Sequence, residues 1–132
     1  MLRISSKIIR AGMEVRAFSS AATSPAFKVQ DNKDFIERVK NSKVPVIIDF
    51  FATWCNPCRA LTPRLESVIA EKQGKILLAK VDIDEHTDLA LDYKVESVPV
   101  LIAMKDGKVL DRIVGLQDTD KLRTFVNKYA DP

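Results

Sequence analysis

The sequence has few of the residues that bind metals or that staple small extracellular domains together. Its 132 residues include two cysteines and one histidine, His86. Two cysteines cannot build the disulfide framework of a small secreted domain, and adding one histidine does not complete a four-ligand zinc site. We therefore expect neither a disulfide scaffold nor a metal centre.

Long apolar runs and glycine-rich tracts are also missing. A membrane-spanning helix needs about 18 or more apolar residues, whereas the longest compact candidate, residues 97–104, has eight residues and contains a proline. Four glycines and six prolines are too few for a collagen-like or low-complexity chain. The length and the 46% of hydrophobic residues are those of one globular domain, with no expected membrane association.

The net charge of +3 is concentrated at the N-terminus. Residues 1–18 carry four basic residues and one acidic residue, which leaves 17 of the 21 basic and 17 of the 18 acidic residues in the rest of the chain. A neutral body lacks the basic stripe that displaces counterions from nucleic acid. Nucleic acid is therefore not an expected partner.

The first 18 residues have the composition of an organellar transit peptide. Arg3, Lys7 and Arg10 fall on one side of a helix, and apolar residues fall on the other. The Arg-Ala-Phe sequence that ends this segment resembles a processing site of mitochondrial precursors. We predict a mitochondrial transit peptide over residues 1–18, a flexible lead-in over residues 19–25 and import into the matrix. A surface amphipathic helix that stays attached is the alternative.

From Ala26 onward, helical and strand periodicities alternate. Near-continuous apolar runs predict central strands that are buried on both faces, and Asp106-Gly107 predicts a hairpin turn. The predicted strands are 26–30, 44–52, 75–83, 98–104 and 109–114, and the predicted helices are 31–42, 56–73, 87–93 and 118–129. Early βαβ units give parallel strands, and the late hairpin adds antiparallel ones. The expected fold is α/β, with a mixed central β-sheet flanked by helices on both faces.

The chemistry is concentrated in Trp54-Cys55-Asn56-Pro57-Cys58, between a predicted strand and a predicted helix. A cysteine at a helix start faces unpaired N–H groups and the positive end of the helix dipole, which stabilise a thiolate. The thiolate is the form that attacks a disulfide. The spacing also lets Cys58 close a four-residue ring with Cys55, and Pro57 stiffens that ring.

Two alternatives to a redox-active pair are weaker. A structural disulfide over so short a loop would constrain the unfolded chain very little, and the inferred compartment is reducing. Two buried, inert thiols are poorly matched to an exposed strand–helix turn. We therefore interpret Cys55 and Cys58 as a redox pair.

Asp49 interrupts an apolar strand six residues before Cys55. A buried carboxylate is costly unless it is paired or functional, and burial is expected to raise its pKa. Lys80, which interrupts the neighbouring predicted strand, is the natural charge partner. A purely structural ion pair of the two is the alternative to a catalytic role.

The segment around Cys55 and Cys58 resembles the thioredoxin family, in which a Cys-x-x-Cys pair occurs in a βαβ context. Four further matches are in register: residues 46–50 ahead of the cysteines, Pro63 after them, Ser97-Val98-Pro99 before a strand, and Gly115 after the last strand. The resemblance covers residues 26–132, and the leader makes the chain most like the mitochondrial members. It departs at Asn56, where most members have Gly, and at Phe51, which is Trp in many relatives.

The resemblance implies a protein dithiol–disulfide oxidoreductase of the thioredoxin type, with a thioredoxin domain over residues 26–132. Its expected catalytic residues are Cys55 as nucleophile, Cys58 as resolving thiol, Asp49 as buried proton acceptor and Lys80 as the charge partner of Asp49. Its expected substrate-binding residues are Trp54, Val98, a cis Pro99 and Gly115, and its expected redox-tuning residues are Asn56 and Pro57.

The same resemblance implies no metal and no bound cofactor, with electrons supplied by NADPH through a thioredoxin reductase. The expected partners are that reductase and disulfide-containing proteins such as peroxiredoxins, in mitochondrial redox homeostasis. The alternative class is a non-enzymatic binding module whose oxidised and reduced forms differ in affinity for a regulatory partner.

Overall fold

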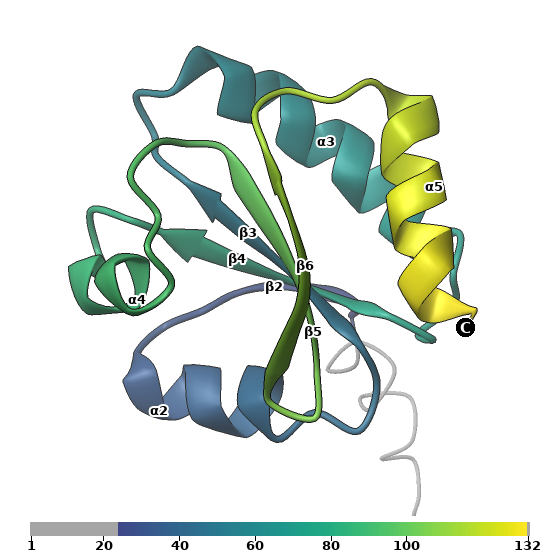
Figure 1. The fold of residues 1–132 in the computed structure, drawn as a ribbon, viewed down its shortest axis with the longest axis horizontal. Coiled ribbons are helices and arrows are strands. Elements are labelled where there is room, and N and C mark those ends of the chain that lie inside the picture. The colour runs from purple at the N-terminus through teal and green to yellow at the C-terminus, as the bar shows by residue number, and fades with distance from the viewer. Residues whose placement is uncertain (1–23, 132) are drawn as a thin grey trace, which may run out of the picture.

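The computed structural model describes residues 24–131 (Figure 1). In this part of the chain, five strands form one mixed sheet in the order β2-β4-β3-β5-β6. The strands are β2 (Ala26–Lys28), β3 (Val46–Phe51), β4 (Leu77–Asp82), β5 (Val100–Lys105) and β6 (Lys108–Val114). β2, β4 and β3 are mutually parallel, whereas β5 is antiparallel to both β3 and β6. The transit peptide predicted for residues 1–18 and most of the predicted lead-in lie outside the described residues.

Helices cover both faces of the sheet (Figure 1). α3 (Asn56–Ala70) and α5 (Thr119–Ala130) pack on one face, and α2 (Asn32–Phe35), the π-helical turn η3 (Ile36–Lys40) and α4 (Thr87–Asp92) pack on the other. The α/β fold expected from the sequence, a mixed sheet between two helical layers, is therefore confirmed. No helix within residues 24–131 is long and apolar enough to cross a membrane.

The central strand β3 supplies side chains to both cores. Ile48 and Phe50 are buried in the core beneath α2 and α4, and Ile47 is buried in the core beneath α3 and α5. Burial of each such side chain contributes about 1.5–3 kcal/mol. Because successive side chains of a strand alternate between faces, Asp49 shares the face of Ile47 and is directed towards α3.

The predicted helix over residues 31–42 is divided into two kinds of turn. Asp31 caps it as expected, because its carboxylate accepts a hydrogen bond from the Asp34 N–H at 2.7 Å. In η3, the Asn41 N–H donates to Ile36 O, which is one residue further back than in an α-helix. The predicted inner face is nevertheless retained, since Phe35 is buried in the core.

Two turns follow the chemistry of their residues. α3 ends at Ala70, earlier than the predicted residue 73, and Gly74 then adopts a left-handed conformation with φ of +87°. The β5–β6 hairpin turns at Asp106 and Gly107, with φ values of +53° and +75°. Positive φ at both central residues is what a two-residue type I′ turn requires.

Candidate active site

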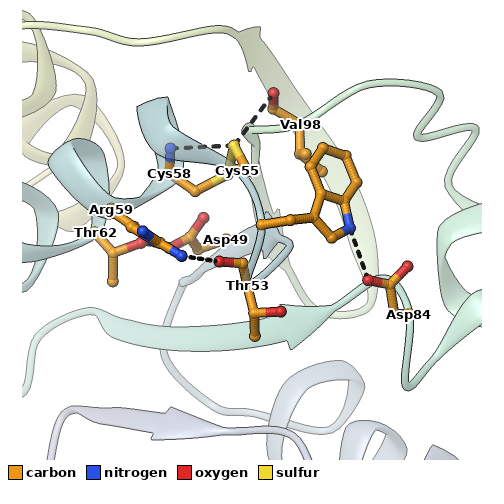
Figure 2. The surroundings of a disulfide bond; sticks show 9 residues. Asp49, Thr53, Cys55, Cys58, Arg59, Thr62, Asp84 and Val98 are labelled. Atoms are coloured by element: carbon orange, nitrogen blue, oxygen red, sulfur yellow. Dashed lines mark hydrogen bonds between the residues drawn. A yellow bond between two sulfur atoms is a disulfide. The ribbon is translucent and has the colours of Figure 1, made fainter.

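The connection from β3 to α3 places the first cysteine at a helix start. β3 ends at Phe51 and α3 begins at Asn56, with Cys55 as its extended N-cap residue. The Cys58 N–H donates to the Cys55 Sγ at 3.2 Å (Figure 2). Because the first N–H groups of a helix have no intrahelical partner, this contact and the helix dipole both favour a negative charge on the Cys55 sulfur.

Cys55 and Cys58 are joined in a disulfide (Figure 2). The two cysteines are only 4% and 3% exposed, although their neighbours Trp54, Asn56 and Pro57 are exposed. The expected exposure of this turn is thus wrong for the two cysteines. Their burial has a physical cause, since side chains that include those of Ala52 and Val98 pack around them.

The loop before β5 approaches the disulfide. The Val98–Pro99 peptide bond is cis, and the Val98 carbonyl oxygen lies 3.8 Å from the Cys55 Sγ (Figure 2). Pro99 is buried, and its carbonyl accepts a hydrogen bond from the Gly115 N–H at 2.9 Å. The three residues expected to bind substrate here are therefore brought together, with the Val98 backbone towards the sulfur.

Two side chains on the outer side of the site are held by hydrogen bonds. Trp54 is 64% exposed, and its Nε1 donates to Asp84 Oδ2 at 2.9 Å. The Arg59 guanidinium donates to Thr53 O at 2.8 Å (Figure 2). These contacts fix an apolar ring and a cation next to the cysteine pair.

Asp49 is fully buried on the α3 side of the sheet. Its Oδ2 accepts a hydrogen bond from Thr62 Oγ1 at 2.8 Å, and its Oδ1 has no hydrogen-bond partner among the described residues. Burial raises the pKa of Asp49 to about 6, against the opposing effects of the Thr62 hydrogen bond and the Lys80 charge; the Glu66 charge adds to the rise.

Lys80 makes no direct ion pair with Asp49, its expected charge partner. The two residues are register partners on β4 and β3, but the Lys80 Nζ lies 2.8 Å from Glu66 Oε2. Both Lys80 and Glu66 are partly exposed, so this pair keeps more of its hydration than a pair with the buried Asp49 would. Lys80 still acts on Asp49 through its charge, which lowers the pKa of that carboxyl group.

A pocket of about 420 Å³ opens beside Cys58. It is lined by Lys28, Phe51, Ala52, Thr53, Cys58, Arg59, Thr62, Pro63 and Lys80. The pocket therefore borders both Cys58 and Thr62, whose hydroxyl contacts Asp49. Within residues 24–131, no group of three or more His, Cys, Asp or Glu side chains is placed to hold a metal ion.

Sequence reasoning missed three residues of this site. Thr62 and Glu66 follow Cys58 at intervals of four residues on α3, so the helical repeat could have placed all three on one face. Asp84 comes shortly after β4, and the carboxyl ends of the parallel strands β3 and β4 meet at one edge of the sheet. Helical spacing could therefore have indicated Thr62 and Glu66, and the position after a parallel strand could have indicated Asp84.

A Cys-x-x-Cys disulfide at a helix start, beside a mixed α/β sheet, defines a protein-disulfide oxidoreductase domain. Comparison with known proteins leads to the same class of protein. The Thioredoxin family model matches residues 26–128. A mitochondrial thioredoxin of Bos taurus is 51% identical over 111 residues, which are 84% of this chain and 67% of the relative. A mitochondrial thioredoxin of Rattus norvegicus is 52% identical over 105 residues, which are 80% of this chain and 63% of the relative.

A solved structure of a thioredoxin variant from Halobacterium salinarum has the same fold, with a TM-score of 0.74 and 34% identity over 83% of this chain and 96% of that one. The chain belongs to the thioredoxin family, as its sequence motifs indicated. The matched part spans about two thirds of the length of the two mammalian relatives.

Proposed function

We propose that this protein reduces disulfide bonds in partner proteins through the Cys55–Cys58 dithiol. The Cys55 thiolate attacks one sulfur of the partner disulfide, a mixed disulfide forms, and the other partner sulfur leaves as a thiolate. Cys58 gives its proton to Asp49 and attacks the Cys55 sulfur, which expels the second partner thiolate. The partner gains two electrons, and Cys55 and Cys58 return to the disulfide.

The observation that carries this proposal is the hydrogen bond from the Cys58 N–H to the Cys55 Sγ at the start of α3. It favours the thiolate on the cysteine that must attack first. The disulfide between the same two residues is the product of the second step. The helix terminus that carries the disulfide therefore also supports the proposed thiolate on Cys55.

The environment of Asp49 supports its proposed role as the proton acceptor. A base is most effective when its pKa lies near the working pH, and burial raises the pKa of Asp49 to about 6. Asp49 is directed towards α3, the helix that carries Cys58. Lys80 is proposed to adjust this pKa through its charge alone, since its direct partner is Glu66.

Substrate binding is proposed on the surface beside the disulfide. The Val98 backbone, next to Cys55, can pair with an extended segment of a partner by strand addition. Trp54 offers an exposed apolar ring, and Gly115 is tied to this surface by the hydrogen bond from its N–H to the Pro99 carbonyl. Asn56 and Pro57, exposed between the cysteines, are proposed to adjust the reduction potential.

The thioredoxin family acts on disulfide-containing proteins, is reduced by thioredoxin reductase and needs no bound cofactor. For this chain we propose an NADPH-dependent reductase as the electron source and peroxiredoxins among the substrates. We propose a role in redox homeostasis of the mitochondrial matrix. The basic leader over residues 1–18 and the mitochondrial relatives support this location.

Insulin-disulfide reduction by the full chain, with NADPH and a thioredoxin reductase, tests the proposal. The wild-type protein should turn over, and Cys55→Ser should abolish turnover. Cys58→Ser should instead retain one attack and accumulate a mixed disulfide on Cys55, visible by mass spectrometry. Redox-dependent partner binding without wild-type turnover would favour the binding-module alternative.

A further inference from the structure

α3 presents a column of three polar side chains towards the sheet. Cys58, Thr62 and Glu66 are spaced by four residues and so lie one above another on the helix. Glu66 accepts a hydrogen bond from Lys80 of β4, and Thr62 donates a hydrogen bond to Asp49 of β3. The hydroxyl that contacts Asp49 thus comes from the helical turn directly after Cys58.

The Thr62 contact distinguishes the two oxygens of the Asp49 carboxylate. Thr62 Oγ1 donates to Oδ2 at 2.8 Å, whereas Oδ1 has no partner among the described residues. The register neighbours of Asp49 are Leu101, which is apolar, and Lys80, whose ammonium group is engaged by Glu66. A proton that arrives at this carboxylate is therefore best placed on Oδ1, because Oδ2 already accepts one.

We propose that Thr62 is a positioning residue of the active site. Its hydroxyl, on α3, holds Asp49 Oδ2 by a hydrogen bond and leaves Asp49 Oδ1 as the atom that accepts the Cys58 proton. This inference rests on the proposed role of Asp49. The inference adds Thr62 as the group that orients the Asp49 carboxylate and determines which of its oxygens accepts the proton. Thr62 and Cys58 line the same pocket, so the positioning hydroxyl and the resolving cysteine lie on one side of the site.

The hydroxyl also favours the ionised carboxylate. Burial raises the pKa of Asp49 and the Thr62 hydrogen bond lowers it, with Lys80 also lowering it and Glu66 raising it. Lys28 and Arg59 line the adjoining pocket, and their charges stay in place when Thr62 is changed. Loss of the hydroxyl alone should therefore raise the pKa of Asp49 from its value of about 6.

Thr62→Val tests the inference, because valine keeps the β-branched shape and removes the hydroxyl. Stopped-flow measurement of mixed-disulfide resolution from pH 5 to pH 9 should show a midpoint shifted upward by about one pH unit. Such a shift slows resolution about fivefold at pH 6 and less than twofold at pH 7. Attack by Cys55 should keep its rate, and Thr62→Ser, which restores the hydroxyl, should behave as the wild type.

A general loss of packing would slow resolution equally at every pH and would not be restored by serine. An unshifted midpoint in Thr62→Val, or equal shifts in the valine and serine variants, overturns the inference. The carboxyl ¹³C shift of Asp49, followed by NMR against pH, gives a readout that is independent of catalysis. If that titration moves in Thr62→Val while Asp49→Asn leaves resolution unchanged, the proposed base role fails and the contact between Thr62 and Asp49 stands.

Discussion

Lys80 and Glu66 join β4 to α3 through an ion pair of 2.8 Å, one helical turn beyond Thr62. The two charges act on Asp49 in opposite directions, since Lys80 lowers the pKa of that carboxyl group and Glu66 raises it. The two charges therefore partly compensate each other, with the effect of Lys80 the larger. Burial is left as the largest influence on its protonation.

We expect Glu66→Gln to lower the pKa of Asp49. The substitution removes the charge that raises this pKa and also frees Lys80 from its partner. The pH midpoint of mixed-disulfide resolution should move downward by a few tenths of a unit, as measured by stopped flow. Glu71→Gln is the matched control, because Glu71 follows α3 and pairs with Arg123. An upward shift, or the same shift in both variants, would contradict the compensation.

Asp49→Asn should stabilise the protein above about pH 6. The folded state of the wild type binds the Asp49 proton more tightly than the unfolded state does, because burial raises the pKa of Asp49 from 3.8 to about 6. Wild-type stability therefore falls between about pH 4 and pH 6 and stays lower above that range. The gain in unfolding free energy should reach about 3 kcal/mol at pH 7 and vanish near pH 3. Urea denaturation at several pH values measures it.

Asp34→Asn is a control of opposite sign. A side-chain hydrogen bond with Arg38 lowers the pKa of Asp34, so its carboxylate stabilises the folded state above the unfolded pKa. This substitution should destabilise the protein at pH 7, and the loss should shrink as the pH falls below 4. The proposed burial effect at Asp49 is contradicted if both variants shift stability in the same direction.

The sequence predicted the sheet and the cysteine pair because both depend on local patterns. A buried central strand shows as a continuous apolar run, and the Cys-x-x-Cys spacing fixes a short ring at a helix start. The hairpin at Asp106-Gly107 was predicted for the same reason, since the turn type requires residues that tolerate positive φ.

The partner of Lys80 could not be predicted in this way. Lys80 and Asp49 are neighbours in the register of β4 and β3, as the sequence predicted for adjacent strands. A lysine side chain is long enough, however, to reach any of several nearby carboxylates. That choice depends on hydration, which favours the partly exposed Glu66 over the buried Asp49. Burial of the cysteines depends in the same way on a distant segment, because Val98 covers them from the loop before β5.

Neutralising the leader should prevent import without affecting the folded body. The variant with Arg3, Lys7 and Arg10 changed to Gln should fail to enter isolated mitochondria, because transit peptides depend on basic residues. Its insulin-reduction activity should equal that of the wild type. A matched control changes three exposed body lysines to Gln, namely Lys33, Lys105 and Lys121, and should be imported normally. Equal import of both variants would refute a targeting role for the leader.

Asn56 is exposed at the first turn of α3, between the two redox cysteines. Its amide group can donate a hydrogen bond to the Cys55 thiolate, which stabilises the reduced form. Its Cβ also restricts a backbone position that glycine would leave free, which favours the closed ring of the oxidised form. Each effect is worth about 1 kcal/mol or less, and the two oppose each other.

We therefore expect Asn56→Gly to change the reduction potential by less than about 30 mV, which corresponds to about 1.4 kcal/mol for this two-electron couple. Asn56→Ala separates the two effects, because it removes the amide and keeps the Cβ. The alanine variant should have a lower potential than the wild type, since only the thiolate's hydrogen bond is lost, and the glycine variant should lie above the alanine variant. Equilibration against glutathione measures all three. A change of about 100 mV in the glycine variant would show that Asn56 dominates the potential, which would turn a reductant into an oxidant.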